Sequence, residues 1–220
     1  MTPDTHDLIR TLAGHAAPVR VLPAPWKRTF TWLVCSLLYT AAVVIVLAPR
    51  GDLASRIQEQ RFAIEAVTAL ATAMLAAFAA FSTVVPGYGR TAVALLILPL
   101  AAWLGSLGAG CLRDWVEVGP RGMALATDWG CFPAILVSGG VPTVLMAVML
   151  RRGAPLTPAL SMALGGLAAG ALADFAMRFH HSEAGVMSLV WHLASVFILL
   201  TVAARTGRRV LTWRVPTWSG

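Results

Sequence analysis

Six runs of apolar residues, each about 20 residues long, alternate along the chain with short polar stretches rich in Pro, Gly or charge. Because a helix rises about 1.5 Å per residue, each run can cross the roughly 30 Å hydrocarbon core of a bilayer. The Pro and Gly residues between the runs mark the helix ends. The pattern predicts helices at residues 27–48, 62–85, 91–110, 131–150, 155–178 and 184–204.

The composition supports the same interpretation. Of the 220 residues, 58% are hydrophobic and 12% are charged, and the mean hydropathy is +0.74. Soluble domains are about 45–50% apolar and about 25% charged, so a soluble enzyme and a disordered regulator are both excluded. We therefore expect an all-α polytopic membrane protein, built as one bundle of six transmembrane helices.

The distribution of charge predicts the orientation of the bundle. Of the 17 Lys and Arg residues, 11 lie in the N-terminal segment, the second and fourth connections and the C-terminal tail. The positive-inside rule then places both termini in the cytoplasm. We expect a cytoplasmic segment at 1–26, the membrane domain at 27–204 and a basic cytoplasmic tail at 205–220. The net charge of +7 is spread over the loops, so no direct contact with nucleic acid is expected.

The first 26 residues are polar or interrupted by proline, and we expect no cleavable signal peptide. Thr2 is the expected N-cap of a short helix that ends before Pro18. Helical spacing gathers an apolar face, which comprises Leu8, Ile9, Leu12, Ala13 and Ala16. Such a helix can lie on the membrane, dock on the bundle or bind a soluble partner in a groove. Its single basic residue, Arg10, favours the last two.

Thiol and imidazole groups gather in the loops predicted to face outward. Cys111 and Cys131 bracket the third connection, and His180 and His181 lie in the fifth connection. The two cysteines could form a disulfide, because the outside of a bacterial inner membrane is oxidising. Alternatively, Cys131 with His180 or His181 and a carboxylate could bind a soft or borderline metal. A third interpretation makes the cysteines small buried residues and the histidines solvated ones.

Three ionisable residues, Glu65, Asp174 and His192, fall within the outer halves of predicted spans. Ionisable groups at that depth are costly, so they are candidates for function by default. Simpler alternatives exist for two of them. Asp174 precedes Arg178 by four residues, which is the spacing of an ion pair within one helix. His192 can form a hydrogen bond across helices.

Two further patterns bear on packing. Small residues repeat every fourth position at Ala69, Ala73 and Ala77 and again at Gly166 and Gly170, which favours packing within the chain over a dimer interface. Several tryptophans fall near span ends and are expected to be interfacial anchors; they are Trp26, Trp103, Trp115, Trp129 and Trp213.

Catalytic motifs are missing from the sequence, which contains no GxSxG, HExxH or phosphate-binding loop. We therefore expect no enzyme. The alternative from that class is a membrane thiol-disulfide oxidoreductase that uses Cys111 and Cys131. Such enzymes usually need a CxxC pair, and the chain has none.

Several segments together resemble the NrsF/OsrA-type anti-sigma-F factors. They are residues 7–13 (DLIRTLA), 18–23 (PVRVLP) with Trp26, 110–115 (GCLRDW), 128–131 (DWGC), 151–155 (RRGAP) and 191–192 (WH). The resemblance implies an inner-membrane protein that binds an extracytoplasmic-function sigma factor of the SigF type through its N-terminal segment. The residues expected to bind that partner are Asp7, Leu8, Ile9, Leu12, Ala16 and Arg20.

The resemblance also implies release of the sigma factor under stress such as heavy metal or oxidant. In the family, signalling relies on cysteines in the periplasmic loops, and one of them matches Cys131. The other belongs to the fifth loop, where this chain has His180 and His181 instead. A regulatory zinc, cadmium or copper ion held by Cys131, His180 and His181, or a switch that uses Cys111, is expected in place of a cysteine pair.

Overall fold

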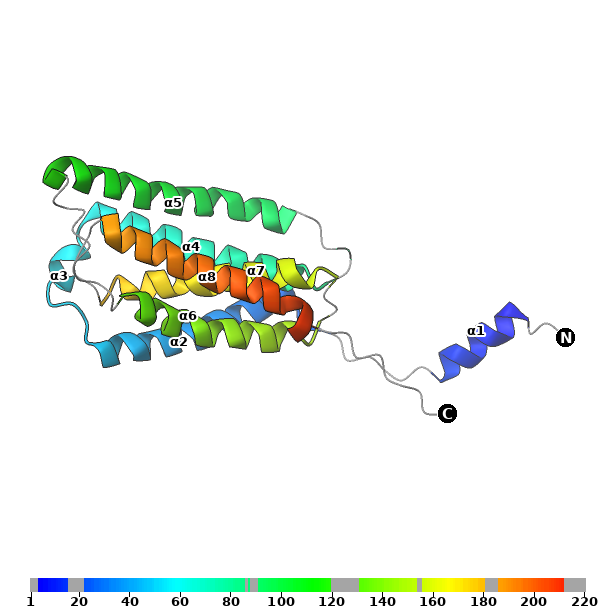
Figure 1. Cartoon of the computed structure of the whole chain (residues 1–220). Coiled ribbons are helices and arrows are strands. Elements are labelled where there is room, and N and C mark those ends of the chain that lie inside the picture. The colour runs from blue at the N-terminus through cyan, green and yellow to red at the C-terminus, as the bar shows by residue number, and fades with distance from the viewer. Residues whose placement is uncertain are drawn as a thin grey trace.

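The computed structural model describes residues 4–15, 22–85, 87, 91–119, 131–153, 156–180 and 186–211. All the regular structure in these residues is helical, as the sequence predicted. The helices are α1 (Thr5–Gly14), α2 (Pro25–Leu47), α3 (Leu53–Arg56), α4 (Gln60–Ser82), α5 (Thr91–Val118), α6 (Cys131–Leu150), α7 (Pro158–Met177) and α8 (Val186–Val210). The six long helices run side by side in one bundle (Figure 1).

Six helices of the described chain, α2 and α4 to α8, are long and apolar enough to cross a membrane, which confirms the predicted number of spans. The start of α2 and the end of α8 lie at the same end of the bundle, opposite the short helix α3 (Figure 1). This is the arrangement that an even number of crossings requires. We call these the termini end and the α3 end.

Two of the helices were predicted to end too early. Helix α5 continues past Gly110 to Val118, because the intervening residues contain no Gly or Pro and Arg113 pairs with Glu117 at 2.8 Å, one turn later. Helix α8 continues to Val210, into the predicted tail, with Arg208 and Arg209 in its last turn. Cations there are favoured by the helix dipole.

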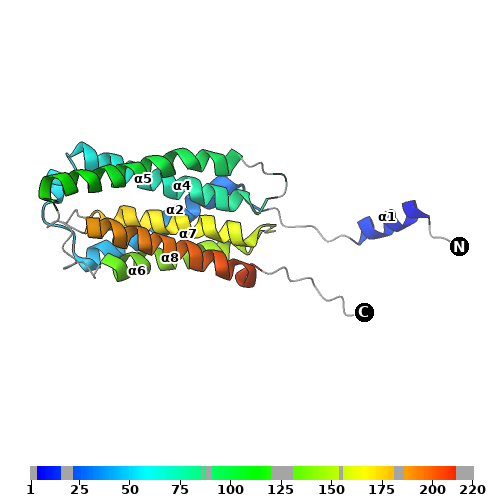
Figure 2. The same ribbon diagram turned by 45° about the horizontal axis from the view of Figure 1, so that its top comes forward.

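Helix α7 is the most deeply buried span and runs between α4 and α8 (Figure 2). Small residues make this possible. A Cβ atom on Gly166 would lie 2.8 Å from the Leu199 carbonyl oxygen of α8, and one on Gly170 would lie 3.0 Å from Val196. The repeat of Ala69, Ala73 and Ala77 in α4 is fully buried. These stripes pack helices within the chain, as predicted.

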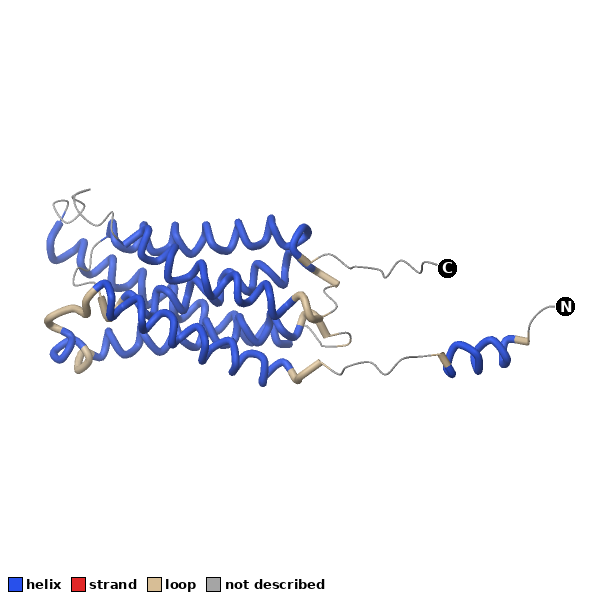
Figure 3. The backbone as a smooth tube through the Cα atoms, turned by 90° about the horizontal axis from the view of Figure 1, so that it is seen from below, coloured by secondary structure: helices blue, strands red, loops and turns tan. Residues whose placement is uncertain are grey.

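Helix α1 is separate from the bundle (Figure 3) and none of its residues is buried. Its N-cap is Asp4, whose side chain accepts a hydrogen bond from the His6 backbone N–H at 3.3 Å. The prediction of Thr2 as N-cap was therefore wrong, since the first helical turn begins two residues later than expected. The helix is short, and a helix of this length is marginal in water without a partner.

Ala48 caps α2 with a positive φ of 68°, which side chains bearing a Cβ rarely adopt. We expect Ala48→Gly to relieve this strain and to stabilise the folded protein by about 1 kcal/mol. Thermal unfolding in detergent measures the change. Ala42→Gly, in the interior of α2, serves as the control and is expected to destabilise by about 1 kcal/mol. Equal destabilisation by both variants would contradict the prediction.

Candidate functional site

The candidate site is a cluster of charged and polar side chains inside the α3 end of the bundle. Glu65 projects from the second turn of α4, and Asp174 from the last turn of α7. Their exposed fractions are 7% and 0%. Both were predicted to be functional candidates because of their depth. The structure places them in a single network, which we call the buried charge network: Arg61, Glu65, Trp103, Asp174, Arg178 and His192.

Arg178, the C-cap of α7, joins the two carboxylates. Its Nη2 donates to Asp174 Oδ2 at 3.1 Å, which confirms the predicted pair within the helix, and its Nη1 donates to Glu65 Oε2 of α4. Arg61 Nε donates to the other oxygen of Glu65 at 3.0 Å. Two acids thus face two arginines, so the network is neutral when His192 is neutral.

Asp174 also accepts from two other helices. His192 of α8 lies with Nδ1 at 2.5 Å from Oδ1, and Trp103 of α5 donates its Nε1–H to Oδ2 at 3.3 Å. Because an ionised carboxylate only accepts, His192 Nδ1 must carry the proton. The predicted hydrogen bond of His192 across helices is confirmed. Its other nitrogen, Nε2, is buried and has no hydrogen-bond partner among the described residues.

Trp103 was predicted to be an interfacial anchor, and that prediction was wrong. Its exposed fraction is 1%, and its indole is directed at Asp174 rather than at the membrane surface. The reason is that α5 extends further than expected, so Trp103 lies well inside the helix instead of near its end. Neither its position nor its neighbours in the sequence indicated a buried partner. Arg61, by contrast, precedes Glu65 by four residues, a signal that sequence analysis could have used.

The network couples four helices, because a member on each of α4, α5, α7 and α8 is hydrogen bonded to a member on another. In a dry interior such contacts are strong, and a partner left without its counter-charge is costly. The arrangement therefore resists partial rearrangement. It can hold the α3 end of the bundle in one packing state until all its members move together.

The residues after Arg178 tie this network to the first connection. Phe179 accepts a backbone hydrogen bond from Arg50 N–H at 3.0 Å, and its ring packs edge-on against Phe62 of α4 at 5.6 Å. His180 Nδ1 lies 2.6 Å from the Ala48 carbonyl oxygen. His180 is therefore held against the end of α2, two residues from the arginine that joins both buried carboxylates.

The first connection carries its own ion pairs. Arg50 donates to Asp52 through Nε at 2.6 Å and Nη2 at 2.8 Å, and Arg56 joins Asp52 to Glu59. The hydrogen bonds from Arg50, with those from Arg56, hold the pKa of the Asp52 carboxyl well below its usual range. Asp52 consequently stays ionised at the mildly acidic pH where free carboxylates begin to protonate.

The other predicted sensing groups are described only in part. Cys111 lies in the helical extension of α5 and Cys131 begins α6, but their side chains and His181 are outside the described residues. The disulfide and the metal site of Cys131, His180 and His181 therefore remain predictions. Within the described part of the chain, no three His, Cys, Asp or Glu side chains are grouped so that they could hold a metal ion.

The predicted partner-binding face is exposed on α1. Leu8, Ile9 and Leu12 have exposed fractions of 51%, 57% and 63%. On the polar side, Arg10 Nη1 lies 3.7 Å from Asp7 Oδ1. Ala16 and Arg20, the remaining members of the predicted set, lie outside the described residues. Docking of this face on the bundle, one of the alternatives from the sequence, is not the arrangement in this structure.

Comparison with known proteins gives one finding. The family model NrsF, described as negative regulator of sigma F, matches residues 12–213. The match contains all six long helices and the last residues of α1. No curated protein and no solved structure matches the chain significantly.

Proposed function

Because the chain belongs to the NrsF family of negative regulators of sigma F, we propose that it is an inner-membrane anti-sigma factor that sequesters an extracytoplasmic-function sigma factor. The observation that carries the proposal is the free apolar face of α1, formed by Leu8, Ile9 and Leu12. An apolar helix face fits a groove on a soluble partner, with anchors at helical spacing. In the proposed complex this helix binds in a groove on the sigma factor and prevents the sigma factor from binding RNA polymerase.

The orientation required by this proposal follows from charge. The termini end carries the connections rich in Lys and Arg, and the positive-inside rule assigns it to the cytoplasm. The apolar face of α1 would then be presented in the compartment where a sigma factor is found. The α3 end, with Cys131 and His180, would face the periplasm.

Release is proposed to begin at that outer end. A metal ion or oxidant acting on Cys131 and the His180–His181 pair would displace His180 from the Ala48 carbonyl oxygen. Arg178, two residues away, would then change its contacts with Glu65 and Asp174, and α7 and α8 would shift together. A signal of this kind must bind one packing state more tightly than the other by a few kcal/mol.

The partner-binding half is tested with Leu8→Asp/Leu12→Asp. Capture of the cognate sigma factor by the full-length protein in detergent should weaken about a hundredfold, because two apolar anchors become charged. The matched control is Thr11→Asp/Gly14→Asp, which adds the same charge to the opposite face of α1, where a Cβ on Gly14 meets nothing within 4 Å. Equal capture by both double variants would reject the proposed face.

The sensing half is tested by repeating the capture after exposure to zinc, cadmium, copper, chromate and peroxide. Loss of capture that requires a metal and is abolished by Cys131→Ser would support the metal site. Cys35, which is exposed on α2 and not paired with another cysteine, gives the control variant Cys35→Ser, expected to respond like the wild type. Release by peroxide alone would favour a thiol switch instead. Unchanged capture under every treatment would contradict the sensing proposal.

A further inference from the structure

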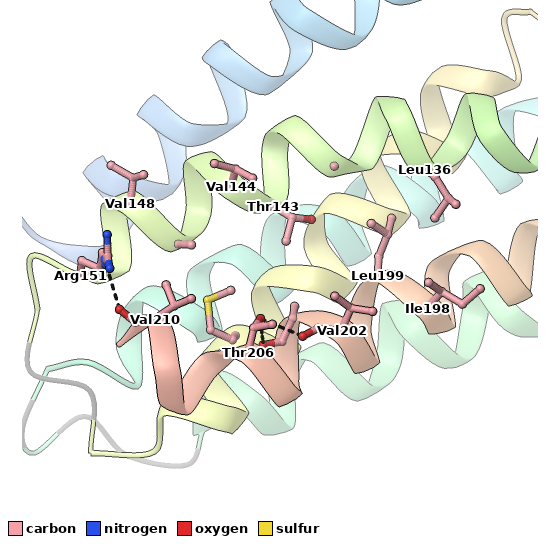
Figure 4. Close-up of a pocket in the computed structure, with 14 residues that line it drawn as sticks. Leu136, Thr143, Val144, Val148, Arg151, Ile198, Leu199, Val202, Thr206 and Val210 are labelled. Carbon is pink, nitrogen blue, oxygen red and sulfur yellow. Dashed lines mark hydrogen bonds between the residues drawn. The ribbon is translucent and has the colours of Figure 1, made fainter. Parts of the chain in front are cut away.

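A cavity of about 550 Å³ opens on the side of the bundle between α6 and α8, with Met162 of α7 among the residues that line it (Figure 4). It extends along α6 from Leu136 to Arg151, the first residue after that helix. At about 1.5 Å per residue this is roughly 22 Å, more than one leaflet of a bilayer core that is about 30 Å thick. The cavity belongs to neither the buried charge network nor α1.

Apart from Arg151 at one end and two threonines, the wall of this cavity is apolar. Its two hydroxyls are already satisfied within their own helices, since Thr143 donates to the Gly139 carbonyl oxygen at 2.7 Å and Thr206 to that of Val202 at 2.8 Å. Val144 and Val202, on opposite helices, have exposed fractions of 64% and 55%. The cavity is therefore open toward the region where lipid chains lie.

One end of the cavity is basic. Arg151 lines it there and donates its Nε–H to the Val210 carbonyl oxygen at 2.8 Å, which links the ends of α6 and α8 (Figure 4). Three further exposed arginines are close to this link along the chain: Arg152 follows Arg151, and Arg208 and Arg209 precede Val210. Apart from Asp4 and Asp7, all the acidic residues of the chain lie in or next to the connections of the opposite end. The rim therefore carries uncompensated positive charge.

We propose that this cavity is a binding site for an anionic phospholipid of the leaflet at the termini end, with an acyl chain between α6 and α8 and the phosphate at Arg151. Basic pockets between transmembrane helices are suited to anionic headgroups. The guanidinium group can donate to phosphate oxygens while its Nε keeps the link to Val210. The proposal does not depend on binding of a sigma factor.

The charge of the rim favours an anionic lipid over a second copy of the protein. A second copy in the same membrane orientation would bring its own basic end beside Arg151, so that like charges would meet, whereas a phosphate group carries the opposite charge.

Two variants test the two parts of the site. Gly140→Leu fills the cavity, because Gly140 lines it and a Cβ there meets nothing within 4 Å. Its control is Gly105→Leu on α5, where the space is equally open and which does not line this cavity. Arg151→Gln removes the headgroup contact, and its control is Arg113→Gln at the α3 end. The full-length protein is incubated with equimolar phosphatidylglycerol and phosphatidylcholine, and retained lipid is counted by native mass spectrometry.

The wild type and both controls should retain phosphatidylglycerol in preference to phosphatidylcholine. Gly140→Leu should reduce total retained lipid about tenfold, and Arg151→Gln should lower the preference for the anionic lipid about fivefold. If Gly140→Leu fails to fold, the proposal is tested by the change that Arg151→Gln causes in the preference for phosphatidylglycerol over phosphatidylcholine. Unchanged lipid retention in both variants would overturn the proposal. So would a dimer in the wild type that Gly140→Leu dissociates without a change in bound lipid.

Discussion

Asp174→Asn is expected to lower the free energy of unfolding by about 4 kcal/mol. The carboxylate is fully buried and accepts from Arg178, Trp103 and His192, so three donors converge on it. An amide of the same shape directs its own N–H groups at one or more of these donors and leaves Arg178 without a charge partner in α7. Breaking a buried ion pair by changing one member typically costs about 3–5 kcal/mol.

Denaturant or thermal unfolding in a fixed detergent measures this loss. The control is Glu117→Gln, which removes the carboxylate of the exposed pair with Arg113, where the exposed fractions of the two side chains are 59% and 73%. Exposed pairs contribute about 0–1 kcal/mol, so this variant should unfold almost like the wild type. Equal losses in the two variants would show that the buried charge network does not hold the bundle together.

Gly166→Leu is expected to destabilise the bundle by about 3 kcal/mol or more, because it separates α7 from α8. A Cβ at this position would lie 2.8 Å from the Leu199 carbonyl oxygen and 2.9 Å from both Leu200 Cα and Ala203 Cβ. Two of these three atoms belong to the backbone of α8, so a change of side-chain rotamer cannot relieve the contact. Overpacking of a close interface costs about 1–3 kcal/mol when side chains can adjust, and more when they cannot.

The same unfolding measurement applies, with Gly108→Leu on α5 as the matched control. A Cβ on Gly108 meets nothing within 4 Å, and leucine is the better helix former, so that variant should be neutral or slightly stabilised. If Gly166→Leu unfolded at the wild-type midpoint, the close approach of α7 and α8 would not be required for stability.

The buried charge network and the close packing of α7 act on the same helix. Helix α7 carries Asp174 and Arg178 at the α3 end and the glycines that contact α8 along its length. In the proposed release, a displacement that begins at Arg178 would reach α8 through Asp174, because the hydrogen bond between Asp174 and His192 and the glycine contacts join these two helices. The end of α8 lies at the termini end, as does the start of α2, which α1 precedes in the chain.

The sequence by itself determined the class of protein, the number of spans and their approximate positions. These follow from local properties, since length and hydropathy decide whether a segment can cross a membrane. Ion pairs within one helix could also be predicted from the sequence, because a spacing of four residues brings Asp174 beside Arg178 wherever that helix lies. Helix ends were harder to predict from hydropathy, because the apolar run ends near Gly110 while α5 continues through polar residues to Val118.

Only the tertiary structure decided which polar groups meet. Glu65, Trp103 and His192 lie on three different helices, and each was a plausible isolated residue: a buried acid, an interfacial aromatic and a histidine bonded across helices. Their convergence around Asp174 and Arg178 depends on how far each helix is rotated and shifted against α7. That rotation is set by the summed packing of the small residues along α7, a property that no single segment of the sequence contains.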